Sequence, residues 1–282
     1  MHTAVQLACP IDQLPLEQEG RRFHCGHGHS FDLARLGYLH LLPVQQKRSR
    51  FPGDSAAMIE ARQRFLNAGF FKDIAKAVAI ALTQHVEMNA ESCILDAGCG
   101  EGYYLDYLSA TLAGKSLFPG LVGLDVGKPG IIAAARRNKN VAWLVASNRR
   151  PPLLPRSVDG ILCMFGFPVF DRFKELLKPG GKVLLVESGP QHLIELRDVI
   201  YEETQTRGPP DLGDAEAQGF EMVKSDRFSY PISLNEQTQI ADLLMMTPHL
   251  FRAPRRGKER AAGLAQIDLT VDVVFRLLQV TA

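Results

Sequence analysis

The chain has 282 residues, 46% of them hydrophobic and 22% charged, so it can bury a sizeable core, which excludes a wholly disordered protein. Its 32 Lys and Arg against 31 Asp and Glu give a net charge of +1, so any nucleic-acid contact needs local basic patches. We expect no signal peptide and no membrane partner, because no apolar run is long enough to cross a bilayer, and five dispersed cysteines favour reduced thiols in the cytoplasm.

Residues 1–45 form a compositional island that contains two cysteines and five of the eight histidines. Its short apolar pieces would make only a small core, and a unit of this size usually needs a metal. Cys9, Asp12, Cys25 and His29 are a chemically possible tetrahedral zinc set, since a carboxylate oxygen can bind zinc. His24 or His27 is an alternative for one ligand, and a metal-free module with two free thiols is the competing interpretation.

A basic, turn-rich linker and a helix follow at 46–68, with Asp54 or Ser55 as the predicted cap of a helix that runs to about Asn67. Basic residues gather here and at two later places, and together they are candidates for holding phosphates. These are Lys47, Arg48 and Arg50, then Arg149 and Arg150, and finally Arg252, Arg255, Arg256, Lys258 and Arg260.

From residue 69 to 282 the pattern alternates helices with short buried strands. After a helix at 71–88, strands are predicted at 93–95, 121–124, 141–145, 158–164 and 182–186, with helices at 102–113, 129–138, 171–178 and 191–205. Longer strands at 220–230 and 267–278 flank a helix at 235–246. This alternation predicts an α/β domain with an open parallel sheet, covered on both faces and carrying an antiparallel pair at one edge.

The strongest motif is the run D-A-G-C-G-E-G that begins at Asp96 and leads from a strand into a helix. Glycine is needed where the backbone turns sharply or a ligand comes close, so Gly98 and Gly100 are candidate binding residues. Asp125 follows the next strand, where a carboxylate can accept hydrogen bonds from the ribose hydroxyls of a bound cofactor. A purely structural turn and a dinucleotide site are the alternatives, although the latter requires a different glycine spacing. The run resembles motif I of Class I (Rossmann-like) S-adenosylmethionine-dependent methyltransferases.

More specific segments are HSFD at 29–32, LLPVQ at 41–45, KRSR at 47–50, PGDS at 52–55 and GPQHL at 189–193. Together with the glycine loop they closely resemble the RlmA (RrmA) family of 23S ribosomal RNA guanine-N1 methyltransferases. The resemblance implies a zinc-ribbon-like RNA-recognition module on a methyltransferase domain, S-adenosylmethionine as cofactor, a guanine N1 in a 23S rRNA hairpin loop as target, and a homodimer.

By the same resemblance the structural zinc would bind Cys9, Asp12, Cys25 and His29, with Asp12 where the family has Cys. Cofactor contacts would fall on Phe71, Gly100, Glu101 and His192, in addition to Asp96, Gly98 and Asp125. Phe165, Phe167 and Phe170 are candidates for stacking on the target base, with core packing expected for at least two of them. No residue is assigned as the catalytic base. A small-molecule methyltransferase and a non-catalytic RNA-binding protein are the alternative functions.

Overall fold

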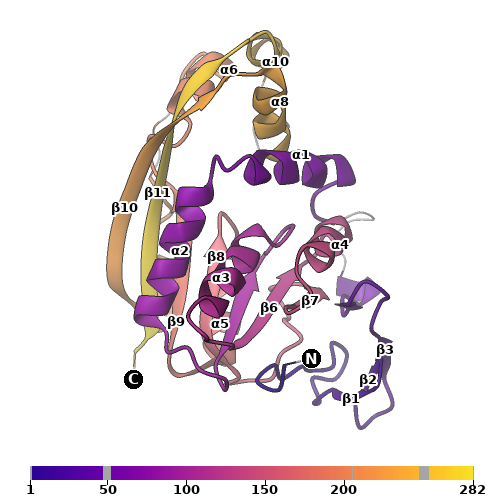
Figure 1. The fold of residues 1–282 in the computed structure, drawn as a ribbon. Coiled ribbons are helices and arrows are strands. Elements are labelled where there is room, and N and C mark those ends of the chain that lie inside the picture. Colours follow the sequence, from indigo (N-terminus) through magenta and orange to yellow (C-terminus); the bar gives the residue numbers. More distant parts are fainter. Residues whose placement is uncertain (1, 47–51, 205, 207, 248–253, 282) are drawn as a thin grey trace.

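A computed structural model describes residues 2–46, 52–204, 206, 208–247 and 254–281. Two sheets organise the fold (Figure 1). A small antiparallel sheet has the order β1-β2-β3, and a large one has the order β10-β11-β9-β8-β5-β6-β7-β4. The α/β prediction is confirmed. The centre of the large sheet holds five parallel strands, and the antiparallel pair lies at one edge, as predicted.

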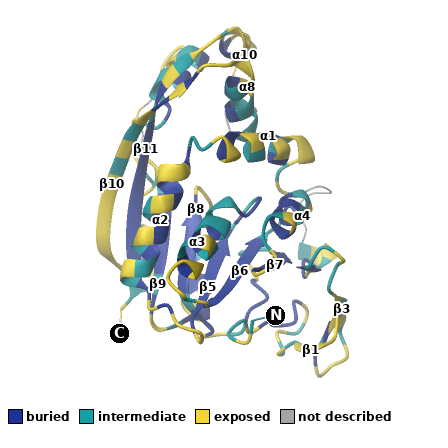
Figure 2. Cartoon of the chain, viewed as in Figure 1, coloured by how far each residue is buried: buried dark blue, intermediate teal, exposed yellow. Residues whose placement is uncertain are grey.

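The parallel strands are largely buried, and most of them are dark blue in Figure 2. They are β5 (Cys93–Ala97), β6 (Gly120–Asp125), β7 (Ala142–Val145), β8 (Val158–Met164) and β9 (Leu177–Ser188). Neighbouring residues alternate between two cores, as a period of two requires, so Ile94 belongs to one core and Leu95 to the other. Helices α2 (Lys72–His85), α3 (Tyr103–Ala113) and α4 (Lys128–Arg137) cover the first face, and α5 (Phe170–Leu176) covers the second.

One strand of the large sheet comes from the N-terminal island. β4 (Tyr38–His40) pairs in parallel with β7 and extends the edge opposite the antiparallel pair. Leu39 and Leu41 therefore lie in the core of the large sheet rather than in a separate small core. The rest of the island contains β1 (Glu17–Glu19), β2 (Arg22–His24) and β3 (Ser30–Asp32), followed by a short 3-10 helix, η1 (Val44–Gln46). The N-terminal module is thus attached to the main sheet by backbone hydrogen bonds.

The antiparallel pair β10 (Phe220–Leu234) and β11 (Ile267–Val280) extends beyond the other strands. Its far end carries α6 (Ile194–Ile200), α8 (Gln237–Met246) and α10 (Arg255–Ala262), which form a cap at the top of Figure 1. α1 (Ala56–Asn67) packs against α8 of this cap and also against α4. The cap therefore holds α1 beside the edge of the sheet at which the parallel strands end.

Two predicted helices are shorter in the structure. The helix expected at 171–178 ends at Leu176 because β9 begins at Leu177, and the one expected at 191–205 is limited to α6, since Tyr201 is already extended. α10 and the short α7 (Gly213–Ala217) were not predicted. α10 carries a basic stretch in which only Gly257 and Ala261 are buried, so it lacks the large apolar residues by which a helix is usually recognised in a sequence. Within the described ranges, no helix is long and apolar enough to cross a membrane.

Candidate functional site

The glycine loop follows β5 at the edge where the parallel strands end. Gly98, Gly100 and Gly102 have φ values of +99°, +55° and +80°, in the left-handed region that favours glycine. A Cβ on Gly98 would meet nothing nearer than the Asn148 amide nitrogen at 3.9 Å, whereas one on Gly102 would lie 2.6 Å from the Trp143 ring. Gly98 therefore leaves open space beside the backbone, and Gly102 is required by packing.

Asp96 is 1% exposed, and neither of its carboxylate oxygens has a hydrogen-bond partner within the described part of the chain. Burial, with a contribution from Asp125, raises the pKa of Asp96 to about 8. The side-chain oxygen of Asn148, which follows β7, is likewise buried without a partner. Because buried polar groups normally have partners, these atoms fit a ligand that brings a positive charge and hydrogen-bond donors. The residues present thus fit S-adenosylmethionine, which carries an ammonium and a sulfonium.

Asp125 ends β6, and its carboxylate is fixed by two backbone groups. Gly100 N–H donates to Oδ2 at 3.1 Å, and Gly127 N–H donates to Oδ1 at 2.6 Å. Burial raises its pKa, and these two hydrogen bonds oppose the rise. A carboxylate accepts about four hydrogen bonds, so two acceptor positions are left for other donors such as ribose hydroxyls.

Glu101 is buried and forms an ion pair with Arg137 of α4, whose Nη2 lies 2.6 Å from Glu101 Oε2. The other carboxylate oxygen, Oε1, has no partner among the described residues. Burial raises the pKa of Glu101, and Arg137 opposes this effect. Oε2 therefore links the loop to α4. Oε1 is available for the cofactor contact predicted for Glu101.

Phe71 and His192, far apart in the chain, meet beside the end of β8. Phe71 precedes α2 and is buried, and its ring centroid lies 6.2 Å from that of His192, which follows β9. The His192 ring stacks on Phe165 at 5.8 Å, and its Nδ1 accepts a hydrogen bond from Asp272 N–H at 3.2 Å. Phe165 has a φ of +48°, a strained conformation for a bulky residue.

The expectation that at least two of the three candidate aromatic residues pack in the core is wrong. Phe170 is buried, but Phe165 is 40% exposed and Phe167 is 86% exposed. The two exposed rings follow β8 directly, and a turn through Gly166 and Pro168 keeps them out of the apolar interior. A Cβ on Gly166 would lie 3.7 Å from the carbonyl oxygen of Ala97, so this turn borders the glycine loop.

Sequence reasoning missed the contribution of the PGDS segment (52–55) and α1. A Cβ on Gly53 would lie 2.6 Å from Gly127 Cα, so the two backbones are in close contact beside Asp125. Arg62 of α1 binds Asp54 at 2.6 Å and lies next to Gly100. The motif is recognisable in the sequence, but nothing in its composition indicates that it contacts a loop more than forty residues further along.

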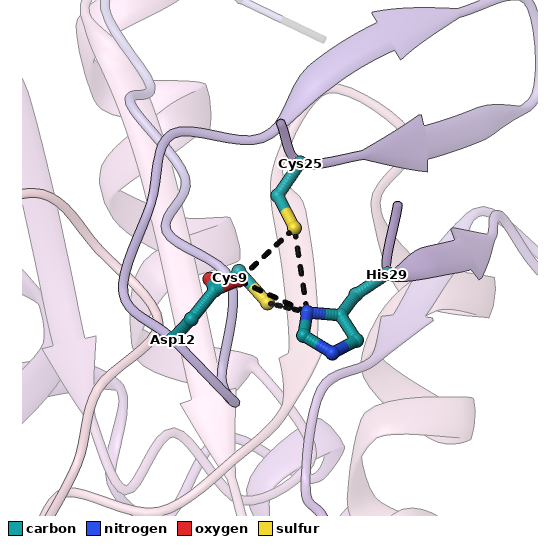
Figure 3. A group of neighbouring side chains, drawn as sticks. All are labelled: Cys9, Asp12, Cys25 and His29. Atoms are coloured by element: carbon teal, nitrogen blue, oxygen red, sulfur yellow. Dashed lines mark hydrogen bonds and ion pairs between the residues drawn. The ribbon is translucent and has the colours of Figure 1, made fainter. Parts of the chain in front are cut away.

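The four predicted metal ligands come together at the N-terminal hairpin (Figure 3). His29 Nδ1 lies 3.6 Å from Cys9 Sγ, 3.4 Å from Cys25 Sγ and 3.0 Å from Asp12 Oδ2, and Cys25 Sγ lies 3.4 Å from Asp12 Oδ2. Ligands at ordinary zinc bond lengths are roughly 3.3–3.8 Å apart in a tetrahedron. Three of the four distances lie in this range and the His29–Asp12 distance is shorter, so the residue types and their spacing fit a zinc ion. His27, an alternative ligand, instead contacts Asp12 Oδ2 at 3.1 Å.

The candidate basic residues differ in their surroundings. Arg149 and Arg150 are exposed after β7, and Arg150 donates to the Ile11 carbonyl of the N-terminal module. On α10, Arg255 pairs with Glu259, and Arg260 donates to the carbonyls of Val199 and Ile200, so Arg260 has a structural role. Lys47, Arg48, Arg50 and Arg252 lie outside the described residues.

Comparisons with known proteins agree with this geometry. Residues 7–50 match the family model described as "RlmA, N-terminal", a zinc ribbon, and residues 94–181 match a methyltransferase-domain model. The chain is 32% identical over 271 residues to the Bacillus subtilis protein named "Putative 23S rRNA (guanine-N(1)-)-methyltransferase YxjB", with 94% of each chain covered. It is 27% identical to the 23S rRNA (guanine(748)-N(1))-methyltransferase of Streptomyces fradiae, with 95% of each covered.

Among solved structures, a Haemonchus contortus phosphoethanolamine N-methyltransferase 2 in complex with S-adenosyl-L-methionine is 16% identical, with a TM-score of 0.47. The match covers 80% of this chain and 58% of that one.

Proposed function

We propose that this chain, which belongs to the RlmA family of 23S rRNA guanine-N1 methyltransferases, transfers a methyl group from S-adenosylmethionine to N1 of a guanine in a hairpin loop of 23S ribosomal RNA. The observation that carries the proposal is that one chain combines two features. The first is a glycine loop beside a buried Asp96 that has no partner among the described residues, and the second is a cluster of two cysteines, an aspartate and a histidine in the N-terminal module.

Each cofactor group has a residue of suitable chemistry in this proposal. Asp96 would take the ammonium beside the open backbone of Gly98, Asp125 the ribose hydroxyls, and Asn148 the adenine edge. Phe71, Glu101 and His192 would complete the cofactor contacts. When bound, S-adenosylmethionine supplies an electrophilic methyl group on a good leaving group, so positioning of the guanine contributes most of the catalysis.

Methylation of guanine N1 also requires removal of the proton that this nitrogen carries. His192 Nδ1 accepts from the Asp272 backbone, so the neutral ring carries its proton on Nε2 and is a hydrogen-bond donor rather than a base. We therefore do not assign His192 as the base that removes the proton from guanine N1. The exposed rings of Phe165 and Phe167, next to the glycine loop, are suited to stack on an unpaired base.

The zinc would be structural, because four protein ligands leave no open coordination position. The family resemblance also supports a homodimer. We propose the reducing environment of the cytoplasm as the site of action, because none of the five cysteines is in a disulfide and the target is ribosomal.

The decisive experiment is methyl transfer from labelled cofactor to unmodified 23S rRNA fragments, followed by mapping of reverse-transcription stops. We expect label on guanine and a stop at one loop position, because a methyl on N1 blocks the Watson–Crick edge. Transfer only to small metabolites would favour a small-molecule methyltransferase. Tight RNA binding with no cofactor binding would favour a non-catalytic protein.

A further inference from the structure

Arg62 reaches across the glycine loop from α1. Its Nη1 lies 3.1 Å from the position that a Cβ on Gly100 would occupy. Its Nη2 forms an ion pair with Asp54 Oδ2 at 2.6 Å and donates to the Met246 carbonyl at 3.3 Å. The side chain is 23% exposed. Contacts from the PGDS segment and α8 thus fix this guanidinium beside the second glycine of the loop.

The surroundings of Arg62 are otherwise acidic. Asp96, Glu101 and Asp125 are buried around the loop, and burial raises the pKa of each. Arg62 counteracts this rise at both Glu101 and Asp125, so its charge acts on both sides of the loop. The other cation described beside the loop, Arg137, is engaged with Glu101 and Asn67.

The acidic residues of this pocket match only part of the charge of S-adenosylmethionine. Carboxylates suit the ammonium and the sulfonium, but the amino-acid end of the cofactor also carries a carboxylate. The carboxylates of Asp96 and Asp125, when ionised, would repel that anion, whereas Glu101 is already paired with Arg137. A fixed guanidinium offers it several N–H donors with little loss of side-chain freedom on binding.

We propose that Arg62 binds the amino-acid carboxylate of the cofactor, with Asp54 holding the guanidinium in place. This inference rests on the proposed function, because it concerns the same pocket. It assigns a ligand group to a residue of α1, for which the sequence analysis predicted only a helix capped by Asp54 or Ser55.

The test compares two ligands that differ by one group, S-adenosylmethionine and decarboxylated S-adenosylmethionine, by isothermal titration calorimetry without RNA. For the unaltered protein we expect tighter binding of the complete cofactor. Arg62→Gln should weaken that binding by about tenfold to a hundredfold, and change binding of the decarboxylated ligand by less than about twofold. Arg62→Lys keeps the charge but not the planar set of N–H donors. It should cause an intermediate loss of affinity for S-adenosylmethionine and leave the affinity for the decarboxylated ligand unchanged.

Arg64→Gln is the matched control, because Arg64 lies on the same helix but pairs with Asp242 of α8. Arg64→Gln should change the affinity for neither S-adenosylmethionine nor its decarboxylated form. If Arg62 only anchors the PGDS segment, Asp54→Asn and Arg62→Gln would weaken both ligands alike, and the inference would be wrong. Unchanged binding of both ligands by Arg62→Gln would also overturn it. Failure of the unaltered protein to bind either ligand would instead contradict the proposed function.

Discussion

Asp96 is the residue whose burial has the clearest thermodynamic consequence. Its pKa is raised to about 8, so between pH 4 and 8 the native state keeps a proton that the unfolded chain has lost. The native state then binds more protons, and stability must fall as pH rises, by at most about 1.4 kcal/mol per pH unit.

We therefore expect Asp96→Asn to increase stability relative to the unaltered protein at pH 8.5 and to have little effect at pH 5. Asn has the same shape but carries no charge that must be buried. Urea unfolding at several pH values in the absence of cofactor measures the difference. A difference that is constant from pH 5 to 8.5 would show that Asp96 does not titrate in this window.

Phe167 is the residue whose exposure is hardest to explain by packing alone. With 86% of it exposed, Phe167→Ala should leave the melting temperature and cofactor affinity unchanged. Loss of one base–aromatic stack, worth about 1–3 kcal/mol, should lower kcat/KM for RNA by roughly tenfold or more. Phe118→Ala is the control. Phe118 is also exposed, but it precedes β6 and so lies where the parallel strands begin, whereas the glycine loop lies where they end. Equal effects of the two variants would exclude a specific role for Phe167.

Single residues were predictable where their spacing carries the chemistry. Asp96, Gly98 and Asp125 follow from a strand–loop–helix pattern, and the structure places them at one edge of the sheet. Phe71 and His192 were predicted only by family resemblance, because their meeting depends on packing between α2 and the segment after β9. Arg62 was missed for the same reason, since its partners Asp54 and Gly100 are brought together by tertiary structure.

At the scale of elements, we expect the N-terminal module to depend on zinc for its stability. We expect about one zinc per chain by elemental analysis, absent from Cys25→Ala, because a small hairpin module has little core of its own. Asp12→Cys should retain zinc and release it to a chelator more slowly, since a thiolate is a softer ligand than a carboxylate. A metal-free protein with an intact hairpin would support the competing interpretation of two free thiols.

The packing of β7 on β6 depends on the absence of a side chain at Gly123. A Cβ there would lie 2.3 Å from the ring of Trp143, which is almost fully buried. Gly123→Ala should therefore lower the free energy of unfolding by about 1–3 kcal/mol, measured by urea denaturation. Gly114→Ala, at the end of α3, is the control, because its nearest contact is 3.5 Å and its φ is −62°. It should be neutral or slightly stabilising. A similar loss of stability in both variants would exclude overpacking as the cause.

Elements with strong local patterns were predictable, and those that depend on distant pairing were not. The five parallel strands and β11 follow from buried apolar runs, whereas β10 is mostly exposed and was predicted as its long partner. β4 has only three residues, and its assignment to the large sheet depends on pairing with β7, about one hundred residues later. Local composition contains no information about such a partner, so Tyr38–His40 was expected to remain within the N-terminal module.

At the scale of the whole molecule, RNA binding must overcome a net charge of only +1. Among the candidate basic residues, Arg149 and Arg150 lie beside the N-terminal module, and Arg256 and Lys258 lie on α10 in the cap. In Figure 1, α10 lies at the top and the N-terminal module at the lower right, with α1 and α4 between them. An RNA that contacts both regions would therefore extend past the glycine loop.

We expect the double variants Arg149→Glu/Arg150→Glu and Arg256→Glu/Lys258→Glu each to weaken binding of a 23S rRNA hairpin at low salt. Each should also reduce the dependence of log K on log salt, by roughly 0.7–0.9 for every phosphate that the variant no longer neutralises. Fluorescence anisotropy over a salt series measures both quantities. Calorimetry should find cofactor affinity unchanged for Arg256→Glu/Lys258→Glu, because α10 lies in the cap. If one pair alone changes the slope, the RNA binds at a single end of the molecule. If the unaltered protein shows no salt dependence, phosphate contacts contribute nothing to substrate binding, which is the behaviour expected of a small-molecule methyltransferase.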